Sequence, residues 1–286
     1  MGDVTVTSGV RDVLGSRLAY EIYTLSGAAR LSGLLLLHGF GANRESLAGH
    51  ARRLAAAGVA AVLTPDMSSL MAGGTAVAQQ RNIEQAADFA AWFARQPALA
   101  GGPGVVLAGH SAGGAVLFEA AAALAAAGTP PRALCLLDGV PWSRTAAAAP
   151  TWPAREVPLL ALRGANSSWN ASGAMQSVLA ALPPPGACVA FLPRSRHGDA
   201  LDPKRNAWAL RLAGLLGPPE CSVLIAQLLD AYVADAVSST PGRFEDGPLA
   251  ALAAAHPRDL VVERRRGQLP EEAPPAAAGA AAFAAS

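Results

Sequence analysis

Short apolar segments alternate with longer alanine-rich amphipathic segments along most of this 286-residue chain. The apolar segments are nearly continuous in Val, Leu and Ala, which is typical of parallel strands covered on both faces. Repeated strand–helix alternation predicts an α/β fold in which helices pack on both sides of a mostly parallel, eight-stranded sheet. The strands are expected at Val4–Thr7, Leu18–Leu25, Gly33–Leu37, Val59–Thr64, Val105–Ala108, Ala133–Leu137, Val157–Leu162 and Ala187–Leu192.

The alanine-rich segments predict the helices, because alanine has the highest helix propensity and allows close packing on a sheet. These helices are expected at Arg44–Ala57, Gln80–Gln96, Ala112–Ala127, Ser172–Leu182, Asn206–Leu216 and Val223–Val237. We predict one main domain over residues 1–217, with a loop or small cap at 139–156, and a helical extension over 218–267. Residues 268–286 are rich in Pro, Ala and Gly with few large apolar groups, so a disordered tail is expected there.

The charge of the chain is nearly balanced, with 22 Lys and Arg residues against 21 Asp and Glu residues. This balance argues against a nucleic-acid partner, which would require a basic patch or stripe. Apolar residues make up 52 % of the chain, too many for a disordered protein. The longest apolar stretch, Ala112 to Gly128, is interrupted by Glu119, whereas a membrane-spanning helix needs about 20 apolar residues with few charges.

The N-terminal residues, Met1 to Thr7, contain no basic region followed by an apolar core, so no secretory signal is visible. We therefore expect a soluble protein of the cytoplasm or an organelle lumen, without an integral membrane segment. Cys135, Cys188 and Cys221 are widely spaced, and the absence of a Cys-x-x-Cys pair argues against zinc or dithiol chemistry. We expect thiols in the core, with a Cys188–Cys221 disulfide as the alternative, and the sequence leaves the oligomeric state open.

A Gly-x-Ser-x-Gly motif runs from Gly109 to Gly113, with Ser111 at its centre. A strand-forming segment precedes it and a helix-forming segment follows, which is the context of a nucleophile on a strained strand-to-helix turn. Side chains at Gly109 or Gly113 are expected to collide with the neighbouring strand and helix. The N-terminus of the following helix favours negative charge nearby. Ser111 is therefore the candidate nucleophile.

A second motif, His38-Gly39-Phe40-Gly41, follows the third predicted strand. Gly39 and Gly41 permit the backbone to turn toward a substrate. Two backbone N–H groups aimed at a developing negative charge would form an oxyanion hole. We expect Phe40 and Ala112, the residue directly after the candidate nucleophile, to supply these two groups.

A general base is expected after the last predicted strand, and His197 follows the strand that ends at Leu192. The loop after the seventh predicted strand contains no carboxylate. Asp138, in contrast, stands at the carboxyl end of the sixth predicted strand, where parallel sheets place their sites. Asp138 is the candidate for orienting the histidine, and Asn166 or Asn170 is the alternative.

Other polar residues are assigned structural roles. His38 and His110 are expected to shape the two motifs, and Asp66 to tie down a loop by hydrogen bonds. His50 and His256 are expected on the surface.

Two further groups lie near the expected site. Asp199 and Asp202 are so close to His197 in sequence that a local role in its loop is favoured. Four large apolar residues are compatible with lining a pocket and equally with packing inside a cap. These residues are Trp142, Trp152, Trp169 and Met71.

Together the motifs resemble the α/β-hydrolase fold of serine hydrolases, over about Leu18 to Leu216, and further details are similar to the chlorophyllases and their relatives. The details are His38-Gly39-Phe40, Asn43, Ser46, Gly58, Pro65, Ile83, Ala86-Ala87, Trp92 and His197-x-Asp199-x-Leu201-Asp202. That family places its acid after the sixth strand, so the resemblance implies Ser111, Asp138 and His197 as a catalytic triad. Chlorophyllases typically have an arginine directly after the nucleophile, and Ala112 departs from that pattern.

We therefore predict a serine esterase that cleaves small carboxylic esters through an acyl-enzyme on Ser111, with no metal or organic cofactor. The near-neutral charge suits uncharged, apolar esters. Two alternatives stay open. One is a chlorophyllase-like hydrolase of a phytyl or other long-chain ester. The other belongs to another class: a ligand-binding protein that retains the fold without turnover.

Overall fold

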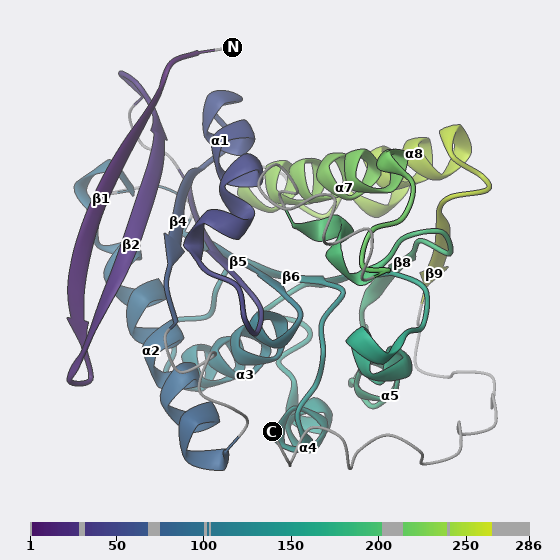
Figure 1. Ribbon diagram of the computed structural model, residues 1–286, viewed down its shortest axis with the longest axis horizontal. Coiled ribbons are helices and arrows are strands. Elements are labelled where there is room, and N and C mark those ends of the chain that lie inside the picture. The colour runs from purple at the N-terminus through teal and green to yellow at the C-terminus, as the bar shows by residue number, and fades with distance from the viewer. Residues whose placement is uncertain are drawn as a thin grey trace.

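The computed structural model describes residues 2–28, 32–67, 75–99, 102, 104–201, 214–238 and 241–264. These residues form one nine-stranded sheet with the strand order β1-β2-β4-β3-β5-β6-β7-β8-β9 (Figure 1). The strands are β1 (Val4–Val13), β2 (Ser16–Leu25), β3 (Gly33–Leu37), β4 (Ala61–Pro65), β5 (Val105–His110), β6 (Ala133–Leu137), β7 (Leu159–Arg163), β8 (Cys188–Phe191) and β9 (Val261–Arg264).

The six strands from β3 to β8 run parallel, whereas the β1–β2 hairpin and β9 add antiparallel pairs at the two edges. The α/β class and all eight predicted strands are confirmed. The ninth strand, β9, was not predicted. The parallel strands are buried almost throughout, which explains their continuous apolar sequence.

Helices cover both faces of the sheet, as the alternation predicted. The described helices are η1 (Arg44–Leu47), α1 (Ala48–Ala56), α2 (Ala76–Ala94), η3 (Pro97–Leu99), α3 (Ala112–Ala126), α4 (Ser143–Ala148), η4 (Ala149–Thr151), η5 (Ser168–Gly173), α5 (Met175–Ala180), η6 (His197–Ala200), α7 (Pro219–Val237), η8 (Glu245–Leu249) and α8 (Ala250–Ala255). Most of the expected helix Asn206–Leu216 and the expected tail Gln268–Ser286 lie outside the described residues.

Two apolar cores form, one on each face of the sheet. Leu35 and Leu37 of β3 belong to the core with α2, α3 and α5, whereas Leu34 and Leu36 belong to the core with α1 and α7. Figure 1 shows α1 and α7 on one side of the strands, and α2 and α3 on the other. Successive side chains of a strand point to opposite faces of the sheet, so they enter the two cores in turn, and consecutive positions are apolar.

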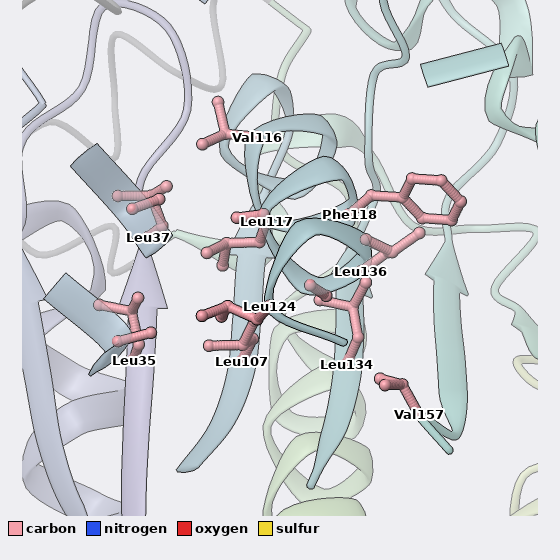
Figure 2. Close-up of a cluster of buried hydrophobic side chains, with 14 of the residues drawn as sticks. Leu35, Leu37, Leu107, Val116, Leu117, Phe118, Leu124, Leu134, Leu136 and Val157 are labelled. Carbon is pink, nitrogen blue, oxygen red and sulfur yellow. The ribbon is translucent and has the colours of Figure 1, made fainter. Parts of the chain in front are cut away.

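Helix α3 is the centre of the first core. Figure 2 shows its Leu117 and Leu124 packed over Leu107 of β5 and Leu134 of β6. Most of the helix is buried, so it is apolar on nearly every side. Because α3 begins directly after β5, this packing determines where the residue between the two elements lies.

The described residues after 218 belong to the same core and sheet. Leu228 and Val233 of α7 are buried in the second core, and β9 pairs with β8. Cys135, Cys188 and Cys221 are buried thiols outside any disulfide, so the alternative Cys188–Cys221 bridge does not form. Among the described helices, none is both long and apolar enough to cross a membrane.

Candidate active site

Ser111 occupies the sharp turn between β5 and α3. Its backbone has φ 55° and ψ −127°, a strained conformation for a residue with a side chain. An added Cβ at Gly109 would lie 2.6 Å from the carbonyl oxygen of Gly113. An added Cβ at Gly113 would lie 2.2 Å from the carbonyl oxygen of His38. The steric reason predicted for the two motif glycines is therefore confirmed.

His197 begins η6, after β8, and lies against Ser111. The distance from His197 Nε2 to Ser111 Oγ is 2.9 Å, and that from His197 Nδ1 to Asp138 Oδ2 is 2.7 Å. An ionised carboxylate only accepts, so Nδ1–H donates to Asp138 and Nε2 is left to accept from the Ser111 hydroxyl. All three side chains are buried. The structure thus brings the three residues selected from the sequence into one hydrogen-bonded chain.

Asp138 directly follows β6 and has a positive φ of 47°. Its backbone N–H donates to Leu162 of β7. Its Oδ1 accepts from the Gly164 N–H at 3.0 Å, and Asn170 Nδ2 lies 3.3 Å from each carboxylate oxygen. Asn170, one of the alternative orienting residues, therefore contacts Asp138, the candidate acid.

The loop with the expected oxyanion-hole residue runs against the nucleophile. An added Cβ at Gly39 would lie 2.7 Å from Ser111 Cβ. The Gly39 carbonyl accepts from His38 Nδ1 at 2.8 Å, so the N–H of Phe40, on the opposite side of the same planar peptide, points away from the His38 ring. No backbone carbonyl among the described residues accepts from the N–H of Phe40 or Ala112. The oxyanion hole formed by these two N–H groups stays a prediction.

Two predicted structural roles, those of His38 and Asp66, are confirmed by contacts. His38 Nε2 accepts from the Met67 N–H, which anchors the His38–Gly39 turn between two loops. Burial lowers the pKa of His38, which disfavours the charged ring. Asp66 accepts from the Arg44 N–H at 2.7 Å and pairs with the Arg44 guanidinium, which ties down the start of η1.

His110 connects the strained turn to the base. Its Nε2–H donates to the His197 carbonyl at 2.8 Å, and the two ring centroids are 4.7 Å apart. Burial, followed by the neighbouring His197, lowers the pKa of His110 to about 3. His110 therefore remains a neutral donor that holds the backbone of the base.

The loop that carries His197 is also anchored on its other side. Asp199 accepts from the N–H groups of Arg196 and Gly217, as its predicted local role requires, and burial raises the pKa of Asp199. Asp202 lies outside the described residues. His50 was expected on the surface, but it is buried and its Nε2–H donates to Ala200 at 2.9 Å. No sequence signal connects these two residues, because they are far apart in the chain.

The large apolar residues separate into different roles. Trp152 is buried and stacks on Phe118, with ring centroids 4.4 Å apart, so its role is to pack in the core. Trp142 is half-buried at the start of α4, and Met71 lies outside the described residues. Trp169 and Phe40 are 48 % and 57 % exposed. Among the described side chains, His, Cys, Asp and Glu form no cluster suited to a metal ion.

The chain belongs to the alpha/beta hydrolase family, whose family model matches residues 34–282. No curated protein sequence matches the chain. A dienelactone hydrolase-like promiscuous phosphotriesterase from metagenomic libraries is similar in structure, with 20 % identity and a TM-score of 0.62, over 83 % of this chain and all of that one. An esterase of Pyrobaculum calidifontis has 15 % identity and a TM-score of 0.56, over 82 % of this chain and 86 % of that one.

A dienelactone hydrolase from Anabaena variabilis has 21 % identity and a TM-score of 0.53, over 73 % of this chain and 95 % of that one. At these identities the likeness establishes the fold. The closer resemblance to chlorophyllases stays a prediction.

Proposed function

We propose that the protein is a serine hydrolase of carboxylic esters, with Ser111, His197 and Asp138 as its catalytic triad. The observation that supports this most is the hydrogen-bonded chain from Asp138 through His197 to Ser111, at 2.7 and 2.9 Å. The strained backbone of Ser111 adds to it, since strain of this kind concentrates at functional sites. Membership of the alpha/beta hydrolase family supports the same reaction class.

In the first half of the proposed reaction, Ser111 Oγ attacks the ester carbonyl carbon while His197 Nε2 takes the hydroxyl proton. The negative charge on the carbonyl oxygen is held by the N–H groups of Phe40 and Ala112. Asp138 keeps Nδ1 of His197 protonated and stabilises the imidazolium. When the carbon–oxygen bond to the alcohol breaks, the imidazolium returns its proton to the leaving oxygen.

In the second half, water attacks the acyl carbon while His197 takes one of its protons. The bond to Ser111 Oγ then breaks, and the proton passes to the serine. The products are a carboxylic acid, an alcohol and the starting enzyme. The protein supplies every catalytic group in these two half-reactions, and the proposal includes no metal or organic cofactor.

A fluorophosphonate probe tests the nucleophile. We expect the wild type to be labelled, Ser111→Ala to resist labelling, and Ser177→Ala to label normally, since Ser177 is exposed and its Oγ donates only to the Ala174 carbonyl. Asp138→Asn should lower kcat/KM for a p-nitrophenyl ester by several orders of magnitude, because His197 would lose its tautomer and its counter-charge. Equal labelling of wild type and Ser111→Ala would contradict the proposal. Complete inactivity with tight ligand binding would support the non-catalytic alternative.

Apolar substrates are supported by two exposed aromatic side chains near the site. Phe40 carries a proposed oxyanion donor, and Trp169 precedes the residue that contacts Asp138. Exposed aromatic side chains next in sequence to residues of the proposed site favour apolar substrate groups. A p-nitrophenyl ester series of increasing acyl length should show rising kcat/KM, and Trp169→Ala should reduce that rise. Hydrolysis of chlorophyll would favour the long-chain alternative over the general esterase.

A further inference from the structure

We propose that Asn170 is a positioning residue that holds the carboxylate of Asp138 in the rotation needed to orient His197. The inference rests on the proposed esterase function and assigns a role to a residue outside the triad. Asn170 lies in η5, in the loop after β7, and is 1 % exposed. It contacts the acid and no reacting atom, so it would act through Asp138.

The orientation of the Asn170 amide follows from its neighbours. Its oxygen faces two backbone N–H groups, those of Ser167 at 2.9 Å and Gly173 at 3.1 Å. Because N–H groups only donate, the oxygen must be on that side. The NH₂ group therefore faces Asp138, and it also donates to the Ala165 carbonyl at 2.9 Å.

The carboxylate of Asp138 has three partners that together set its rotation. Asn170 Nδ2 lies 3.3 Å from both Oδ1 and Oδ2, so one NH₂ group bridges the two oxygens. The Gly164 N–H holds Oδ1 at 3.0 Å, and His197 Nδ1 meets Oδ2 at 2.7 Å. Without Asn170, the carboxylate keeps the Gly164 N–H on Oδ1 and His197 on Oδ2, and rotation about its bond to Cβ is less restricted.

The backbone after Asn170 is bent to complete this arrangement. Ala171, Ser172 and Gly173 have φ angles of 51°, 56° and 78°, so three consecutive residues are left-handed. The turn brings the Gly173 N–H back onto the Asn170 oxygen. Left-handed residues with side chains are unfavourable, and such geometry persists where the surroundings over-determine it. Here the turn directs the NH₂ group at the acid.

A double-mutant cycle separates positioning from simple support of the fold. Asn170→Ala should reduce kcat/KM for a p-nitrophenyl ester by about 10- to 100-fold, mostly through kcat, because small misplacements of a catalytic group carry costs of this size. In an Asp138→Ala background the same substitution should change kcat/KM less than twofold, since the acid through which it acts is gone. Asn166→Ala is the matched control: the same change in the same loop, at an exposed residue, and it should stay within twofold of wild type.

A second variant and a second readout cover the case in which Asn170→Ala does not fold. Asn170→Asp keeps the shape and the oxygen acceptor but replaces the donor to Asp138 by a second carboxylate, so it should lose at least as much activity, with the same dependence on Asp138. Proton NMR of the His197–Asp138 hydrogen bond requires no turnover, and its low-field signal should shift in either Asn170 variant and not in Asn166→Ala.

The outcomes are distinguishable. Wild-type kcat/KM together with an unshifted His197–Asp138 NMR signal in Asn170→Asp would overturn the proposed role of Asn170. Equal losses from Asn170→Ala with and without Asp138 would indicate structural support alone and would also overturn it. If the wild type neither labels nor turns over esters, the proposed function fails, and the NMR signal still decides whether Asn170 sets the His197–Asp138 contact.

Discussion

Gly113→Ala tests whether the contact between α3 and the His38 loop positions the site. The added methyl group would lie 2.2 Å from the His38 carbonyl oxygen and 2.8 Å from that of Leu37. Both contacts are to backbone, so no flexible side chain can move aside. Ordinary contact would require the strand end and the helix to separate by about 1 Å, a displacement at which catalysis typically falls about 10²-fold.

Two effects of opposite sign act on the stability of this variant. Alanine is better than glycine inside a helix by about 1 kcal/mol, whereas overpacking costs about 1–3 kcal/mol. Because the clash is with backbone, we expect the clash to dominate and the free energy of unfolding to fall by about 1–2 kcal/mol. The oxyanion loop should move with the strand, so kcat should fall more than KM rises.

The assay compares kcat/KM for a p-nitrophenyl ester, the rate of fluorophosphonate labelling and the unfolding midpoint. Gly247→Ala is the control, because an added Cβ there meets no atom of the described residues within 4 Å. We expect the control to match the wild type and Gly113→Ala to lose about 10²-fold in kcat/KM. Wild-type kinetics and stability in Gly113→Ala would refute the reasoning.

Two further substitutions test buried polar groups. Thr145 donates to Glu119 at 3.1 Å and accepts from the Trp142 N–H, so Thr145→Val should lower the free energy of unfolding in urea by about 1–3 kcal/mol, and an unchanged midpoint would contradict this. His110 has a folded pKa of about 3 against 6.5 in the unfolded chain, so the unfolded state takes up a proton first and stability falls as pH drops below 6.5. His110→Gln should remove up to about 1.4 kcal/mol of that loss per pH unit between pH 6.5 and about 4, and identical urea-unfolding slopes against pH for the two proteins would count against it.

The parallel strands and the strained turn were predictable because their signals are local. A strand buried on both faces is apolar almost throughout, and the interiors of β3 to β8 are, with polar residues confined to or next to their carboxyl ends. The glycines on either side of Ser111 lie within a few residues of the atoms they would strike. Sequence reasoning could also select Asp138 and His197 as candidates, since Asp138 directly follows β6 and His197 lies in the loop after β8.

The end of one strand and the whole of another were missed, because strand pairing overrode local preference. β1 was expected to end at Thr7, where Ser8 and Gly9 weaken the strand pattern, but it continues to Val13 by pairing with β2. The Tyr20 side chain covers Gly9, which compensates for its missing side chain. β9 is a four-residue strand at the edge of the sheet, and it is recognised as a strand by its pairing with β8.

The sequence by itself determined the class of fold, the proposed nucleophile on its turn and the strands that carry the proposed acid and base. Only the tertiary structure decided which residues support them: Asn170 on the acid, His110 and His50 on the turn of the base. The reason is physical. Residues that are neighbours in the sequence set the period of a helix or strand and the steric requirements of a tight turn. A hydrogen bond between distant segments depends instead on how whole layers pack.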